Sequence, residues 1–315
     1  MGTFTSHPLL TLSITALLLV AAPALAADTA AAPSAGASDP ASGPPERAMV
    51  TTGLDSEAVA RANPRQAVWL DAGDSGRVLG LLEPEQTPSP NGALILLNDE
   101  GLSADAGVIG ALRQPLAAAG WAALSLGLPM PAYALQKARQ VAAESPPASS
   151  PEAPAPADTA AKAGDSVMID VMEKDLKGLM DAYHKQLRER LQAAIDELAK
   201  RGYSPIVLLG LGQGADVITR DVAANRPSVG ALIWLAPSFQ AGRDQPLPEL
   251  MKTVNQPVLE LFSQREQSGE ASQRRALMSR SGYRQYGQQP VAMALPPVRR
   301  DAPQIAARVT AWLAR

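Results

Sequence analysis

The sequence predicts an α/β fold: a mostly parallel sheet with an antiparallel N-terminal hairpin and helices on both faces. Three observations support it. Strand-like apolar runs alternate with helical periodicity along most of the 315 residues. Two short apolar runs, residues 67–72 and 77–83, are separated only by the turn residues of a hairpin. Residues 92–97 are apolar throughout, as in a strand that is covered on both faces.

A helix and a further strand follow this central strand. Ser103 is the expected N-cap of the helix, and Gly120 is its expected end. Pro115 lies inside the helix and should kink it or separate its last turn. Residues 121–126 then predict the next strand, because they are almost entirely apolar.

The second half of the chain repeats the strand and helix pattern. Its longest helix carries apolar residues at spacings of three and four from Met172 to Leu198, and Gly202 ends it. The remaining elements expected are strands at 204–209, 230–235 and 257–262, a helix at 215–224, and a closing helix capped at Asp301. Such repeating units predict parallel strands joined by helical crossovers.

The N-terminus predicts export. Leu9 to Leu25 is an apolar run that leads into Ala24-Leu25-Ala26, the small-x-small pattern of signal-peptidase sites. Residues 1–26 are therefore expected to be a signal peptide cleaved after Ala26, which leaves a periplasmic protein without a stable membrane span. The alternative is an uncleaved membrane anchor, because Met1 to Pro8 contains no Lys or Arg.

Two segments have the composition of disordered chain. Residues 27–55 form an expected tether, rich in Ala, Ser, Pro and Gly near its start, and residues 141–165 form an expected insert of similar composition. Neither segment carries enough apolar mass to offset the entropy of ordering. The rest of 56–315 suits a single domain by its length.

Composition excludes several classes of function. Lys and Arg number 28 against 31 Asp and Glu, so no basic surface for nucleic acid is indicated. Because the chain has no cysteine, it has neither disulfides nor thiolate metal ligands. No pattern specifies a cofactor or a metal, and none is expected.

The expected ligand position follows from the sheet, since loops at the carboxyl ends of central parallel strands line a crevice. Two loops form this candidate crevice: Asn98, Asp99, Glu100 and Gly101 after one strand, and Gly210, Leu211, Gly212, Gln213 and Gly214 after another.

The second loop resembles the nucleophile elbow of the α/β-hydrolases, in which a serine between two glycines begins a helix. Gly212 holds the serine position here. The segments NGALILLNDEG, LAAAGWAALSLGLP, IVLLGLGQGA and ARVTAWL resemble an uncharacterised family of exported bacterial α/β-hydrolase-like proteins, named only as a domain of unknown function. That family often has glycine at the elbow. The resemblance covers most of 67–315 and implies this fold with a degenerate elbow.

The residues for acyl transfer are incomplete. Gly212 has no side chain to attack with, and no histidine occurs between Gln213 and Arg315 to accept a proton. Glu266 is a vestigial candidate for the acid of the triad. The resemblance places the backbone N–H groups of the oxyanion hole at Gln213 and near Asn98 or Asp99.

Other sites fit the sequence less well. Gly210 to Ala215 satisfies a G-x-G-x-x-A dinucleotide pattern, but no acidic residue ends the next strand to bind a ribose. Ser125 and Ser238 lie at strand ends without a histidine as base. Asp99 and Glu100 could bind a hard cation only with further ligands.

Two functions remain open. The first is a non-catalytic binding or scaffold protein of the cell envelope, whose crevice or surface engages a small molecule, a peptide or an envelope protein. The second is an esterase-type or peptidase-type hydrolase in which Asp99 or Glu100 activates water directly. Because both carboxylates would repel an anion, the crevice is expected to prefer a neutral or zwitterionic group.

Overall fold

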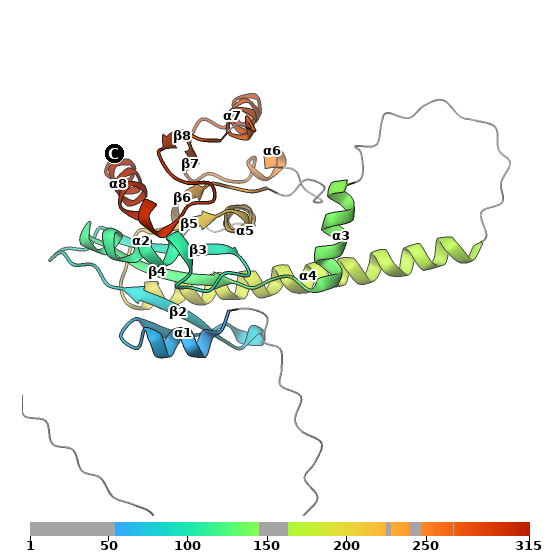
Figure 1. The fold of residues 1–315 in the computed structure, drawn as a ribbon, viewed down its shortest axis with the longest axis horizontal. Coiled ribbons are helices and arrows are strands. Elements are labelled where there is room, and N and C mark those ends of the chain that lie inside the picture. The colour runs from blue at the N-terminus through green and yellow to red at the C-terminus, as the bar shows by residue number, and fades with distance from the viewer. Residues whose placement is uncertain (1–53, 145–162, 225–227, 240–246, 267) are drawn as a thin grey trace, which may run out of the picture. The chain divides into compact units, whose positions relative to one another are not determined.

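The computed structural model describes residues 54–144, 163–224, 228–239, 247–266 and 268–315 (Figure 1). All of them belong to one compact unit. The expected signal peptide and most of the expected tether lie outside the described residues. Among the helices of the described part, none is long and apolar enough to cross a membrane.

One sheet organises the described chain. Its strand order is β1-β2-β4-β3-β5-β6-β7-β8. β1 pairs antiparallel with β2, and β2 pairs antiparallel with β4, whereas every later pair is parallel. This arrangement confirms the predicted fold class, and its order is that of the α/β-hydrolase fold. The strands are β1 (Ala67–Asp71), β2 (Arg77–Glu83), β3 (Gly92–Glu100), β4 (Trp121–Leu128), β5 (Ile206–Leu211), β6 (Val229–Leu235), β7 (Val258–Ser263) and β8 (Tyr286–Val291).

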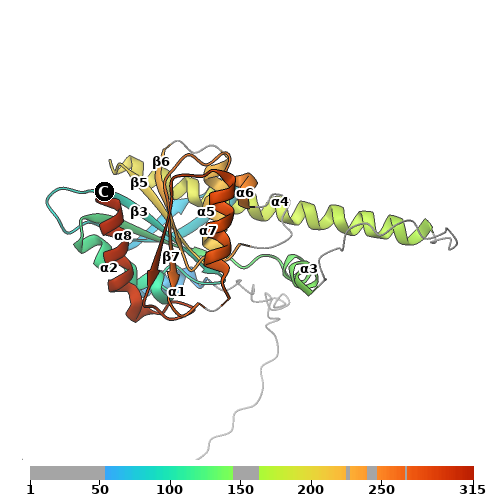
Figure 2. The ribbon, with the colours of Figure 1, turned by 90° about the horizontal axis from the view of Figure 1, so that it is seen from above.

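Helices cover both faces of the sheet. α2 and α8 pack on one face, and α4 and α5 pack on the other (Figure 2). Side chains alternate along β3, so that Leu94 and Leu96 face α2 and α8 while Ile95 and Leu97 face α4 and α5. The helices are α1 (Ser56–Ala62), α2 (Gly107–Ala118), α3 (Tyr133–Glu144), α4 (Ala163–Lys200), α5 (Gln213–Ala223), α6 (Leu247–Leu250), α7 (Glu270–Ser281) and α8 (Ala302–Leu313).

The helix after β3 begins later than its predicted N-cap. α2 starts at Gly107 rather than after Ser103, and Pro115 lies inside it without separating the last turn. The Asn98 side chain explains the late start, because its amide donates to the backbone carbonyls of Ser103 (2.8 Å) and Ala106 (3.1 Å). These bonds hold the preceding residues in a loop.

Both ends of the segment 141–165, which the sequence predicts as a disordered insert, are helical. Residues 141–144 belong to α3, and residues 163–165 belong to α4. Residues 141–144 include two alanines, the residue with the highest helix propensity, and residues 163–165 (Ala-Gly-Asp) form the start of α4. Residues 145–162 lie outside the described residues.

Candidate functional site

The turn at Gly212 keeps the backbone shape of an elbow. β5 ends at Leu211, α5 begins at Gln213, and Gly212 between them has φ 55° and ψ −119°. Its N–H donates to the Leu235 carbonyl (3.1 Å), and its carbonyl accepts from the Ser238 N–H (3.0 Å). The loop after β6 therefore holds this turn from one side.

The backbone geometry of the turn favours glycine at positions 210 and 212. A positive φ at Gly212 is costly for any residue with a side chain. At Gly210 a Cβ would lie 2.4 Å from the backbone carbonyl of Gly214 and 2.5 Å from the amide nitrogen of Ala215. The glycines thus let α5 pass close to the end of β5, which is a structural reason for the motif independent of any chemistry.

The carboxylate of Asp99 fills the space beside Gly212. A Cβ on Gly212 would lie 2.4 Å from Asp99 Oδ2 and 2.5 Å from its Cγ. Asp99 Oδ1 accepts hydrogen bonds from the backbone N–H of Gln213 (2.9 Å) and from that of Glu100 (2.9 Å). The side chain from the end of β3 thus occupies the place where a serine side chain would begin.

The N–H groups of Gln213 and Glu100 lie where the sequence expectation puts its two backbone donors, at Gln213 and at a residue near Asn98 or Asp99. The N–H of Asp99 instead donates to Asn98 Oδ1 (3.0 Å), and the Asn98 side chain is fully buried. Because α5 begins at Gln213, its N-terminal partial positive charge also favours the Asp99 carboxylate.

The Glu100 carboxylate forms an ion pair with a residue of α3. This carboxylate accepts from Arg139 of α3 at 2.9 and 3.0 Å, and the Tyr183 hydroxyl of α4 donates to it at 3.2 Å. The Pro129 carbonyl oxygen lies 2.9 Å from the same Tyr183 hydroxyl and shares its single proton, and the Arg139 guanidinium lies over the Tyr183 ring. No short-range pattern in the sequence revealed these partners, because they are distant in the chain.

The resemblance expects the acid of a triad at Glu266 and the histidine in the loop after β8. Glu266 follows β7, but its Oε1 accepts from the Ala271 N–H (2.9 Å), so that it caps the start of α7. The residues after β8, Ala292 to Val298, include no histidine. His184, the histidine in the described part of the chain, lies on α4 and is partly buried.

The two candidate serines have structural partners. Ser125 is fully buried in β4 and accepts a hydrogen bond from Arg113 (3.0 Å). Ser238 is exposed after β6 and accepts from the Gln213 side chain (2.9 Å). No base accompanies either hydroxyl in these contacts.

Neither a dinucleotide nor a metal ion fits this turn well. A pyrophosphate would meet the Asp99 carboxylate at the N–H groups it needs, and Leu235 and Ala236 stand where a ribose ligand would be required. The described residues contain no group of three or more His, Asp or Glu side chains that could hold a metal.

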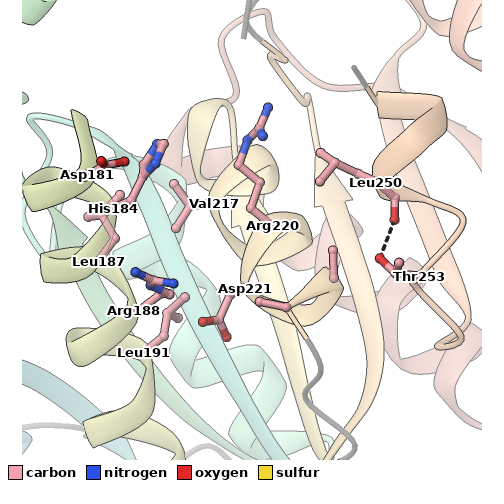
Figure 3. Close-up of a pocket in the computed structure, with 12 residues that line it drawn as sticks. Asp181, His184, Leu187, Arg188, Leu191, Val217, Arg220, Asp221, Leu250 and Thr253 are labelled. Atoms are coloured by element: carbon pink, nitrogen blue, oxygen red, sulfur yellow. Dashed lines mark hydrogen bonds between the residues drawn. The ribbon is translucent and has the colours of Figure 1, made fainter. Parts of the chain in front are cut away.

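A separate pocket of about 450 Å³ lies between α4, α5 and α6 (Figure 3). Charged side chains of both signs line it together with an apolar wall. Arg220 forms an ion pair with the buried Asp216 (2.9 Å). None of the lining residues comes from the two crevice loops. The lining is Asp181, His184, Leu187, Arg188, Leu191, Val217, Arg220, Asp221, Ala223, Ala224, Leu250 and Thr253.

Comparison with known proteins places the chain in a family. The model of the family described as "Protein of unknown function (DUF3530)" matches residues 7–315. A search of curated proteins found no match.

Among solved structures, the chain is similar to an esterase domain of a Rhodothermus marinus protein, with 13% identity, a TM-score of 0.48, and coverage of 78% of this chain and 96% of that one. It is also similar to Est1E from Butyrivibrio proteoclasticus, with 15% identity, a TM-score of 0.48, and coverage of 79% of this chain and 96% of that one. A third similar structure is a dienelactone hydrolase from Anabaena variabilis, with 14% identity, a TM-score of 0.47, and coverage of 79% of this chain and 95% of that one. At such identities a likeness concerns the fold alone, and the strand order of this chain establishes that fold independently.

Proposed function

Since the chain belongs to the DUF3530 family, whose function is unknown, we propose from the site itself that it is a non-catalytic, α/β-hydrolase-like binding or scaffold protein. The observation that carries this proposal is the Asp99 carboxylate beside Gly212. The space in which a hydrolase presents its nucleophile holds an anion that is already hydrogen-bonded. An ester carbonyl finds neither a nucleophile nor a vacant oxyanion hole there.

Loss of the base supports the same proposal. A serine-type reaction needs a proton acceptor beside the nucleophile, and residues 292–298 after β8 offer none. Glu266 is engaged at the start of α7. The nucleophile and the base of a triad are therefore both missing, and single losses of this kind already reduce rates by orders of magnitude.

We place this function in the cell envelope. The basis is the sequence of residues 1–26, with its apolar run and Ala24-Leu25-Ala26. The partner would be a small molecule, a peptide or an envelope protein. The pocket between α4, α5 and α6 is a second surface for such a partner, because it combines an apolar wall with charges of both signs.

A hydrolase with a non-standard catalytic set is the alternative. One observation favours it: Asp99 Oδ2 lies next to Gly212, and only Oδ1 of that carboxylate accepts hydrogen bonds from the described residues. A carboxylate held in this way could activate a water molecule. Glu100 fits this role less well, since Arg139 and Tyr183 bind its carboxylate.

An assay of ester and peptide hydrolysis distinguishes the non-catalytic proposal from the hydrolase alternative. The mature protein, purified to homogeneity, is assayed with a panel of nitrophenyl esters and fluorogenic peptides across pH. We expect no saturable hydrolysis. Saturation kinetics that Asp99→Asn abolishes would refute the non-catalytic proposal and support the alternative. Asp196→Asn is the matched control, because Asp196 contacts Gln192 on α4 and lies outside both crevice loops.

A further inference from the structure

The N–H groups of Gln213 and Glu100 converge on a single oxygen. They come from different elements, one from the start of α5 and the other from the end of β3, and each lies 2.9 Å from Asp99 Oδ1. Convergent donors at a helix N-terminus are a general means of binding anions. In this structure the bound anion is a side chain of the protein itself.

The surrounding contacts fix these donors in place. Buried Asn98 binds the carbonyls of Ser103 and Ala106 and accepts from the Asp99 N–H, which holds the β3 loop. The Glu100 carboxylate is held by Arg139 and Tyr183. The backbone N–H of Glu100 is therefore oriented by contacts that do not involve the Asp99 carboxylate.

Gly212 leaves room for this occupant. Any side chain at position 212 would begin within 2.4–2.8 Å of the Asp99 carboxylate atoms. The absence of a side chain at 212 and the presence of a carboxylate at 99 are thus complementary features of one site. A serine nucleophile and the observed position of Asp99 exclude each other.

We propose that Asp99 is a built-in occupant of an intact anion site, an autoinhibitory contact that excludes carboxylate and acyl ligands from the crevice. The donors remain organised without it, so removal of the Asp99 carboxylate uncovers a site for small carboxylates. This corrects the sequence expectation in one respect. Asp99 does not only repel an anion from the crevice but occupies the position that an anion would take.

Acetate is the probe that tests the proposal. In Asp99→Ala we expect acetate to raise the midpoint of thermal unfolding saturably, with a dissociation constant on the order of millimolar for so small a ligand. The backbone amide resonances of Gln213 and Glu100 should shift in the same titration. Sodium chloride at equal ionic strength should give neither effect.

Asp99→Asn is the matched variant, because its side-chain oxygen can still accept from both N–H groups. We expect Asp99→Asn and the wild type to show no acetate site. Equal acetate binding by the wild type, or folded Asp99→Ala without acetate binding, would overturn the proposal.

Two further measurements cover the case in which Asp99→Ala does not fold. Asp99→Ser retains a small polar side chain and should also bind acetate. In the wild type, a scalar coupling across the hydrogen bond should join the Gln213 amide nitrogen to the Asp99 carboxyl carbon, and its absence would also contradict the proposal. Both experiments measure binding rather than turnover, so their failure does not decide whether the protein is catalytic.

Discussion

Replacing Gly212 by alanine should destabilise the protein through two separate effects. The first is backbone strain, since φ 55° with ψ −119° is a sparsely populated conformation that costs a residue with a side chain about 1–3 kcal/mol. The second is displacement of the Asp99 carboxylate, because the new Cβ would lie 2.4 Å from Oδ2. Asp99 is only half-buried, so water replaces part of what its two hydrogen bonds supply, and losing both should cost about 2 kcal/mol, the magnitude of one charged hydrogen bond. The expected total is about 3–5 kcal/mol.

A double-mutant cycle isolates the second effect. Asp99→Ala alone should cost about 2 kcal/mol, because it removes the same hydrogen bonds. In the double variant the alanine at 212 finds no carboxylate to displace, so only the strain is added to the Asp99→Ala loss. The two single effects should therefore exceed the double effect by about 2 kcal/mol.

Urea unfolding followed by circular dichroism measures these free energies. Gly178→Ala is the matched control, since Gly178 lies on α4 without a positive φ, and an added methyl group there would meet nothing within 4 Å. That substitution should be neutral or stabilising and additive with Asp99→Ala. Additivity of Gly212→Ala with Asp99→Ala would refute the assignment of Asp99 to this space.

Three further results are expected. Gly212→Ser should not yield an efficient esterase in a nitrophenyl ester assay, because no histidine follows β8 to accept the proton. Burial raises the pKa of Tyr283 from 10.0 to about 12, so the free energy of unfolding should fall as pH rises from 10.0 to about 12, with a smaller slope in Tyr283→Phe. Glu260→Gln should cost about 3 kcal/mol in urea unfolding, since Glu260 is fully buried and its loss leaves Arg274 without its closest carboxylate.

The elements predicted most accurately from the sequence are those that carry a complete apolar pattern within their own residues. β3 and β6 are buried runs between α/β crossovers, and α8 carries a regular apolar face. Among the α-helices and strands of the described residues, the unpredicted ones are α1, α3, α6, α7 and β8, and the last two show the reason. α7 (Glu270–Ser281) buries only Ala271, Arg274 and Met278, so it has no apolar stripe to detect. β8 (Tyr286–Val291) contains Gly, two Gln and Pro, which resemble a loop, and it forms only because β7 offers an edge to pair with.

The candidate site also has some features that the sequence predicted and others that it did not. The sequence by itself determined the turn at Gly212, because strand, glycine spacing and helix are local features. It also determined the missing nucleophile and the missing histidine after the last strand. Residue identity alone decides these points, whatever the side chains touch.

Only the tertiary structure decided what fills the turn. Asp99 and Gln213 are separated by 114 positions, and the parallel pairing of β3 with β5 brings the carboxylate onto the N–H of Gln213. The fates of Glu100, bound by Arg139 and Tyr183, and of Glu266, bound at the start of α7, also follow from packing. A carboxylate can act as a base, as an ion-pair partner or as a helix cap. The donors that the fold places around it decide which of these roles it has.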